Sequence, residues 1–141
     1  MHPLERFLAI LGAILCATIT LVLWVDFSAY QAIWPMPGLY FLELPGLTIL
    51  CALLVLAGKP RAGMFTWACA GGLVAFMLLG AFSVGFFYLP VVLVFISLGI
   101  VMLIKRKGPV ALHLFVFMLA GVLQAALMLA AIRILYPGAI F

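Results

Sequence analysis

The chain has 141 residues, of which 70% are hydrophobic and only 7% are charged, and its formal net charge is +4. A sizeable soluble catalytic domain is excluded, because so few polar residues cannot cover the surface of a compact soluble fold. The basic residues stand in short hinges between apolar runs, so they indicate topology signals and lipid-headgroup contacts rather than nucleic-acid binding.

The apolar runs predict an all-α, polytopic integral membrane bundle, a single transmembrane domain over residues 1–141. A helix needs about 20 mostly apolar residues to cross a bilayer. The first run lacks a small-residue cleavage pattern after it, so we interpret it as a retained helix rather than a signal peptide. The charged and turn-forming residues divide the chain into five expected spans, at residues 7–25, 44–58, 62–82, 90–104 and 110–135.

Aromatic residues gather between the first two spans, in the outer segment 26–43 and at its border. Trp and Tyr favour the membrane interface, where the ring meets lipid and the polar tip meets water. The segment predicts an aromatic belt that fixes the depth of the spans, with a short interfacial helix over 26–33. The alternative is a docking surface, or a lid over a lipid or quinone headgroup. The aromatic residues concerned are Trp24, Tyr30, Trp34 and Tyr40.

The longest uncharged stretch, from Ala62 to Ile104, is about twice as long as one helix needs to cross the hydrocarbon core. We place a break between Ser83 and Pro90, where glycine and proline weaken a helix. This break separates the third span from the fourth. The alternative is four spans, with residues 62–104 forming one re-entrant unit.

The basic residues support the count of five spans. With a cytoplasmic N-terminus, Arg133 alone faces outward, in agreement with the positive-inside rule. The chain is therefore predicted to be a multi-pass protein of the cell inner (plasma) membrane, with its C-terminus outside. The residues expected in the cytoplasm are Arg6, Lys59, Arg61, Lys105, Arg106 and Lys107.

Two hairpins of the chain resemble each other, which leaves open a fold of one helix plus two repeated hairpins. Leu44–Pro45 and Leu89–Pro90 each precede an apolar run, and each proline is expected in the first turn of a helix. A basic turn with glycine then follows in both hairpins. The alternative is that any two hairpins obeying the same insertion rules look alike.

Small residues recur every fourth position on three of the spans. In lipid, such faces let helix backbones approach closely, so they predict tight packing within the bundle or against a partner. We expect Gly72 to lie at the closest approach and Leu98 to face lipid. The predicted packing residues are Ala9, Ala13, Ala17, Gly71, Gly72, Gly121 and Ala125.

Three charged residues, Asp26, Glu43 and Arg133, are expected together near the outer interface. A charge at the edge of the apolar slab gains from a carboxylate partner, so Arg133 is predicted to pair with Glu43 or, in second place, with Asp26. The alternatives are that Arg133 extends alone to the headgroups or joins an anion or substrate site. Gln124, inside the fifth span, is expected to hydrogen-bond to another helix.

The remaining polar residues do not form a cofactor pattern. Cys16, Cys51 and Cys69 all lie in apolar runs and are predicted to be unpaired core residues. His113 has no second intramembrane histidine with which to hold a haem. We therefore expect no cofactor and no metal, and the absence of a catalytic motif predicts that the protein is not an enzyme.

These observations favour a structural or accessory subunit, or a scaffold, in a membrane complex. Its expected partners are the lipid bilayer and another membrane protein or a second copy of the chain. The alternative function is a small transporter or channel-like protein for apolar or lipid-like molecules, since a hydrophilic solute would need a more polar path.

Overall fold

The structure, a computed structural model of the whole chain, describes residues 2–30, 32, 34–35, 37–80 and 84–135. Over these ranges the protein is an all-α bundle, and five helices are long and apolar enough to cross a membrane, as predicted. The helices are α1 (Pro3–Tyr30), α2 (Gly38–Leu56), α3 (Ala62–Leu79), α4 (Leu89–Arg106) and α5 (Val110–Leu135), with a short 3₁₀ turn, η1 (Gly85–Tyr88), before α4.

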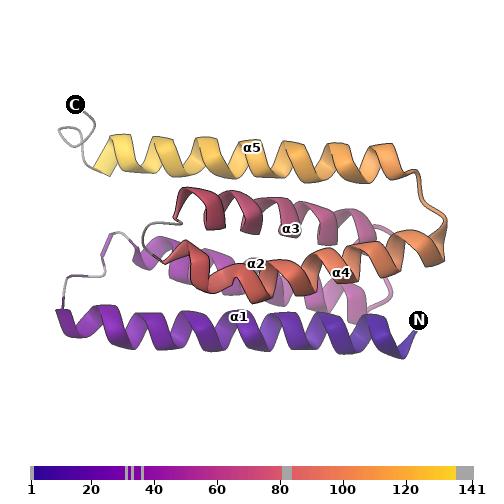
Figure 1. Cartoon of the computed structure of the whole chain (residues 1–141), viewed down its shortest axis with the longest axis horizontal. Helices are drawn as coiled ribbons and strands as arrows, with labels where there is room; N and C mark the ends of the chain where they lie inside the picture. The colour runs from indigo at the N-terminus through magenta and orange to yellow at the C-terminus, as the bar shows by residue number, and fades with distance from the viewer. Residues whose placement is uncertain (1, 31, 33, 36, 81–83, 136–141) are drawn as a thin grey trace.

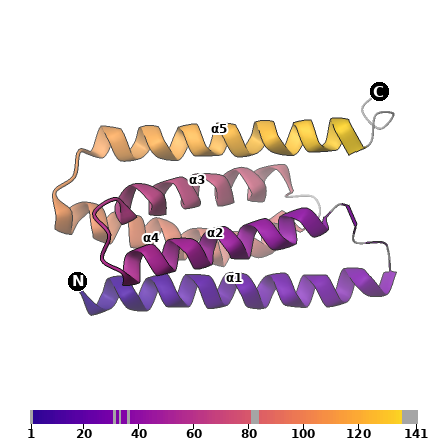
Figure 2. The ribbon, with the colours of Figure 1, turned by 180° about the vertical axis from the view of Figure 1, so that it is seen from behind.

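Four of these helices pack as a bundle, and the fifth lies outside it. The helix α1 packs against α2 and α4, and α3 packs against the same two helices from the other side. The helix α5 packs along α3 and lies at the opposite edge of the molecule from α1 (Figures 1 and 2). The central helix is therefore α3, which alone connects α5 extensively to the rest of the bundle.

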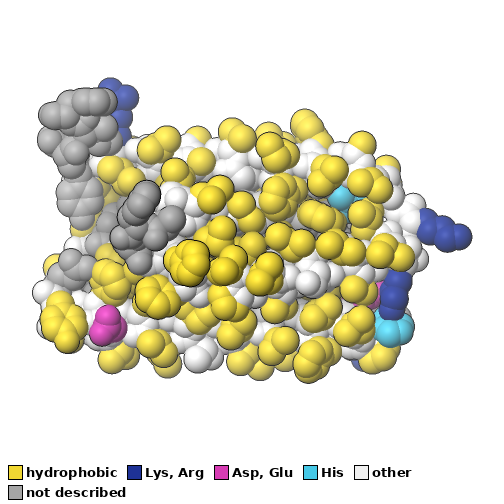
Figure 3. Space-filling view, viewed as in Figure 1, with side chains coloured by type: hydrophobic (Ala, Val, Ile, Leu, Met, Phe, Trp, Pro, Cys, Tyr) yellow, Lys and Arg dark blue, Asp and Glu magenta, His cyan; other side chains and the backbone are white. Residues whose placement is uncertain are grey.

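The connections between helices separate two chemically different ends. The N-terminus and the turns α2–α3 and α4–α5 lie together at one end, and the segment between α1 and α2 lies at the other (Figure 1). On the face seen in Figure 3, charged side chains gather at the two ends and hydrophobic side chains cover the surface between them. We call the first of these the basic end, because it carries Arg6, Lys59, Arg61, Lys105, Arg106 and Lys107.

The predicted break between the third and fourth spans is present. The helix α3 ends at Leu79 and α4 begins at Leu89, and each runs the length of the bundle (Figure 1). The backbone N–H of Gly85 donates to the carbonyl oxygen of Gly80 at 2.7 Å, and a Cβ on Gly85 would lie 2.6 Å from the Met77 carbonyl oxygen. Glycine is thus required at this turn. Residues 81–83, including the predicted end of the third span, lie outside the described residues.

The start of the second span was predicted six residues too late. The helix α2 begins at Gly38, where the amides of Leu39 and Tyr40 donate to the carbonyl oxygens of Pro35 and Pro37. Pro45 therefore lies inside α2 rather than in its first turn, whereas Pro90 does lie in the first turn of α4. The true start signal is the pair Pro35 and Pro37, because their carbonyl oxygens accept hydrogen bonds from the first amides of α2.

The helix α1 also differs from its predicted limits. It continues without interruption to Tyr30, so residues 26–30 form its last turns rather than a separate interfacial helix. Residues 31 and 33, the rest of that predicted helix apart from Ala32, lie outside the described part of the chain.

The buried face of α1 does not follow the predicted stripe of every fourth residue. Ala9 is fully buried, but Ala13 and Ala17 are only partly buried. Residues four apart on a helix drift by about 40° per step, whereas spacings of three and four together stay on one face. The buried face combines spacings of three and four residues and consists of Glu5, Ala9, Gly12, Cys16, Thr20 and Leu23.

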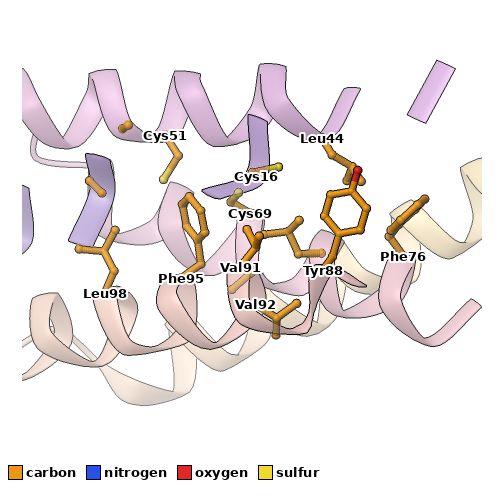
Figure 4. Close-up of a cluster of buried hydrophobic side chains, with 14 of the residues drawn as sticks. Cys16, Leu44, Cys51, Cys69, Phe76, Tyr88, Val91, Val92, Phe95 and Leu98 are labelled. Carbon is orange, nitrogen blue, oxygen red and sulfur yellow. The ribbon is translucent and has the colours of Figure 1, made fainter. Parts of the chain in front are cut away.

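The core lies between the first four helices. Figure 4 shows side chains from α2 and α4 meeting around cysteines from α1, α2 and α3. One buried hydrogen bond connects α1 to η1, between the hydroxyl groups of Thr20 and Tyr88, which are 2.8 Å apart. Leu98 is fully buried in this core, so the expectation that it faces lipid is wrong. It belongs to the buried face of α4 together with Val91, Phe95 and Met102.

The two similar hairpins do not pack alike. The helices α2 and α3 contact each other, whereas α4 and α5 are consecutive but do not pack along each other, because α5 packs on α3 instead. The hairpins therefore share their direction through the bundle but not their packing.

Candidate functional site

Glu43 lies inside a membrane-spanning helix rather than in front of it. Because α2 begins at Gly38, Glu43 stands more than one turn from the helix start, in the segment that is apolar enough to cross a membrane. A carboxylate at this depth is costly, and an ionisable residue inside a span is by default a candidate for function. Glu43 is therefore the first residue of the candidate site.

Gln124 is the partner that the structure gives to Glu43. Its Nε2 donates to the Oε2 of Glu43 at 3.3 Å and so connects α5 to α2, as expected for an amide inside a span. Gln124 is buried, and its Oε1 would lie 3.9 Å from a Cβ on Gly72 of α3. The pair therefore connects α2 to α5 across α3.

Tyr40 adds a hydroxyl group without a partner near this pair. It lies one turn before Glu43 on α2 and is buried, with its ring 5.5 Å from the ring of Phe76. The Tyr40 hydroxyl is fully enclosed and has no hydrogen-bond partner among the described residues, as is also true of the Trp67 indole N–H. A buried polar atom without a partner is unusual in folded proteins, so Tyr40 is a further candidate residue of the site.

The structure does not bring Arg133 to either of the acidic residues with which it was predicted to pair. Among the described residues, neither Glu43 nor Asp26 lies within 4.0 Å of the Arg133 guanidinium. Asp26 belongs to α1 and Arg133 to α5, which are the two opposite edges of the molecule (Figure 1). The Glu43 carboxylate accepts a hydrogen bond from Gln124 instead. The side chains of Asp26 and Arg133 are both exposed.

The four interfacial aromatic residues divide into two groups. Trp24 packs against Phe41 with ring centroids 6.2 Å apart, and Tyr40 packs against α3, so these two residues connect helices. Tyr30 and Trp34 are exposed. The exposed residues have the position expected of an aromatic belt, whereas Trp24 and Tyr40 belong to the bundle.

The three cysteines converge in the core although they belong to three different helices (Figure 4). Cys16, Cys51 and Cys69 are all buried and free, as predicted, and the Cys51 thiol lies 3.4 Å from the Thr66 hydroxyl. Within the described ranges, no group of three or more His, Cys, Asp or Glu side chains is arranged to hold a metal ion. His113 is also used locally, with its Nδ1 2.9 Å from the carbonyl oxygen of Pro109.

The contact between α3 and α5 depends on two glycines. A Cβ on Gly71 would overlap the carbonyl oxygen of Phe117, and a Cβ on Gly121 would lie 3.2 Å from the carbonyl oxygen of Gly71. Gly71, rather than Gly72, is therefore at the closest approach, which corrects the prediction. Gly72 instead faces the side chain of Gln124.

Two grooves flank this contact. The groove between α2 and α5 consists of two hollows, of about 270 and 150 Å³, that share Phe65 and Ala68 as walls. The groove on the other side of α5 has a volume of about 280 Å³ and is lined by α3 and α5. We call these the α2–α5 groove and the α3–α5 groove.

Removing the amide of Gln124 should destabilise the protein. In Gln124→Leu, the Glu43 carboxylate loses its described partner inside the span, and we expect a loss of about 1 kcal/mol of unfolding free energy. A double-mutant cycle with Glu43→Leu, measured by unfolding in mixed detergent micelles, should give a coupling energy of similar size. If the losses of unfolding free energy in the two single variants add up to the loss in the double variant, the two side chains do not interact.

No protein-family model, curated protein or solved structure matches this chain.

Proposed function

We propose that this protein is an accessory or scaffold subunit of a membrane complex, and that the α3–α5 groove binds a transmembrane helix of its partner. One observation carries the proposal. Two pairs of small residues, each four apart, line the same groove, Gly71 and Ala75 on α3 and Gly121 and Ala125 on α5. Gly71 and Gly121 already hold α5 against α3, so Ala75 and Ala125 are the small side chains beside which a further helix can pack closely, and close packing drives association in lipid.

The exposure of α5 supports this proposal. Only His113, Gln124 and Met128 are buried among its residues, and most of the others are exposed to lipid or to another protein. Because α5 packs mainly on α3, most of the surface on both of its flanks remains accessible. A helix placed in this way offers a larger contact surface than a helix inside the four-helix bundle.

Two adjacent alanines allow a matched test. Ala125 lines the groove, whereas Ala126 is exposed on the outer side of α5. The protein is purified from its native membranes in mild detergent as wild type, Ala125→Leu and Ala126→Leu. We expect a partner in stoichiometric amount with the wild type and with Ala126→Leu, and its loss with Ala125→Leu. Equal recovery with both variants, or a partner that is a second copy of the chain, would contradict the proposal.

A second candidate function, a small carrier of apolar or lipid-like molecules, is favoured by the Glu43–Gln124 pair. This pair is polar, lies within the spans and stands at one end of the apolar α2–α5 groove. The test is the transfer of a fluorescent lipid between the leaflets of proteoliposomes. A carrier would increase this transfer and lose activity in Glu43→Leu, whereas a scaffold would not transfer the lipid at all.

We further propose that the protein lies in an inner membrane with its basic end in the cytoplasm. Six of the seven Lys and Arg residues are at that end, as the positive-inside rule requires. The prediction can be tested with single cysteines on a background without Cys16, Cys51 and Cys69. A cysteine at Ser28 should react with an impermeant reagent added outside, and a cysteine at Lys105 should react only after the membrane is opened. The reverse pattern would show the opposite orientation.

A further inference from the structure

The α2–α5 groove has walls from three helices and a nearly uniform apolar lining. The helices α2 and α5 both lie beside α3, which forms the floor between them (Figure 2). The hollow nearer the basic end and the hollow nearer Gln124 meet at Phe65 and Ala68. Between the two ends, the walls are Leu47, Leu54, Met64, Ala120, Leu123 and Leu127.

The length of this groove matches one leaflet of a bilayer. Along α3 it extends from Arg61 to Gly72, which is about 16 Å at ~1.5 Å per residue. Half of the hydrocarbon core measures about 15 Å. An extended acyl chain that begins at the basic end would therefore reach Gln124 near the middle of the membrane.

The basic end of the groove carries two cations without a described counter-charge. Lys59 and Arg61 line the groove there, and both are exposed. Among the described residues, neither has a carboxylate within 4.0 Å. The one acidic residue at this end, Glu5, is instead 4.0 Å from the Nη2 of Arg106.

Arg106 also fixes the turn from which these two cations extend. Its Nη1 donates to the carbonyl oxygens of Lys59 and Pro60, at 3.2 and 3.3 Å. The backbone of the α2–α3 turn is thereby held against the end of α4. Lys59 and Arg61 are left at the entrance of the groove, where they can bind an anion.

From this arrangement we propose that the α2–α5 groove binds an anionic phospholipid. One acyl chain lies along α3 between α2 and α5, and the phosphate group lies between Lys59 and Arg61. The apolar lining fits the chain and the cations fit the phosphate, since each Lys or Arg near a membrane surface favours anionic lipid. This lipid site is separate from the α3–α5 groove proposed for a partner helix, so either proposal can fail without the other.

The test compares two pairs of basic residues at the same end of the molecule. Lys59→Gln/Arg61→Gln and Lys105→Gln/Lys107→Gln each remove two charges from exposed side chains, but only the first pair lines the groove. The full chain in neutral detergent is titrated with phosphatidylglycerol, and bound lipid is counted by native mass spectrometry. We expect one tightly bound lipid in the wild type and in the Lys105/Lys107 variant, and binding weaker by about 30-fold in the Lys59/Arg61 variant. Equal weakening in both variants would show a general surface attraction and overturn the proposal.

A second pair of variants tests whether the chain occupies the groove. Ala68→Leu places extra volume where the two hollows meet, and Ala126→Leu adds the same volume on the exposed side of α5. Loss of phosphatidylglycerol in Ala68→Leu alone would support the site. If Ala68→Leu still binds phosphatidylglycerol, or if glycerol phosphate displaces the bound lipid, only the headgroup is bound, and the acyl chain does not lie in the groove. Equal binding of phosphatidylcholine would overturn the role given to Lys59 and Arg61.

Discussion

Replacing Gly71 with alanine should separate α5 from α3 and cost about 3 kcal/mol of unfolding free energy, at the upper end for an overpacked contact. The added Cβ would overlap the carbonyl oxygen of Phe117 and come within 2.9 Å of its carbonyl carbon. Both atoms belong to the backbone, so they cannot rotate away. The two helices must therefore move apart along the contact that holds α5.

The neighbouring glycine provides the control. In Gly72→Ala the new Cβ would lie 3.9 Å from Gln124 Oε1, an ordinary contact, and alanine favours a helix by about 1 kcal/mol over glycine. Gly72→Ala should thus be neutral or stabilising. Unfolding in mixed micelles compares the two, and cysteine cross-linking between α3 and α5 reports their separation. Similar stability of both variants would show that α3 and α5 do not touch at Gly71.

Truncating Leu98 should be the second large effect, with a loss of about 2 kcal/mol. Leu98 is completely buried in the core between α4 and the helices around it. In a membrane the hydrophobic transfer contributes little, because lipid is as apolar as the core, so the loss comes from the cavity that Leu98→Ala leaves. The expected value therefore lies at the lower end of the range for leucine-to-alanine changes in soluble proteins.

Leu93 on the same helix serves as the matched control for Leu98. Its side chain is 56% exposed, against 0% for Leu98, so Leu93→Ala removes contacts with lipid rather than with the core. Leu93→Ala should change the unfolding free energy by less than about 0.5 kcal/mol. If both variants melt alike, α4 does not present Leu98 to the bundle.

The number of helices could be predicted from the sequence, and so could most of their limits at the basic end to within two residues, although α1 begins at Pro3 rather than at residue 7. Charges and glycine-proline turns interrupt the apolar runs there, and the fifth helix has the predicted limits, residues 110–135. The opposite end was harder to predict, because the apolar and aromatic residues around Tyr40 continue across the helix start without a charge. The predicted second span therefore began after Glu43, which placed that residue outside the membrane.

The side-chain partners could not be predicted, because they depend on how the helices pack. The sequence predicts that Gln124 needs a partner in another helix, but only the position of α5 beside α3 makes that partner Glu43. Periodicity likewise cannot distinguish Gly71 from Gly72, since adjacent residues on a helix point about 100° apart and both faces of α3 carry small residues. The pairing of Glu5 with Arg106 has no sequence signal, because the two residues are far apart in the chain.

The helices differ in length in a way that affects the surrounding bilayer. The helices α2, α3 and α4 have 19, 18 and 18 residues, so each is about 27–29 Å long, whereas the 26 residues of α5 extend for about 39 Å. The helix α1 at the opposite edge has 28 residues and extends for about 42 Å, so the hydrophobic thickness of the protein is greater at its two edges than in the middle. A bilayer that matches the inner helices requires α5 to tilt, and the glycine contact at its middle is the point about which it can tilt. Membrane thickness would then set the crossing angle of α5 and the width of the grooves on either side of it.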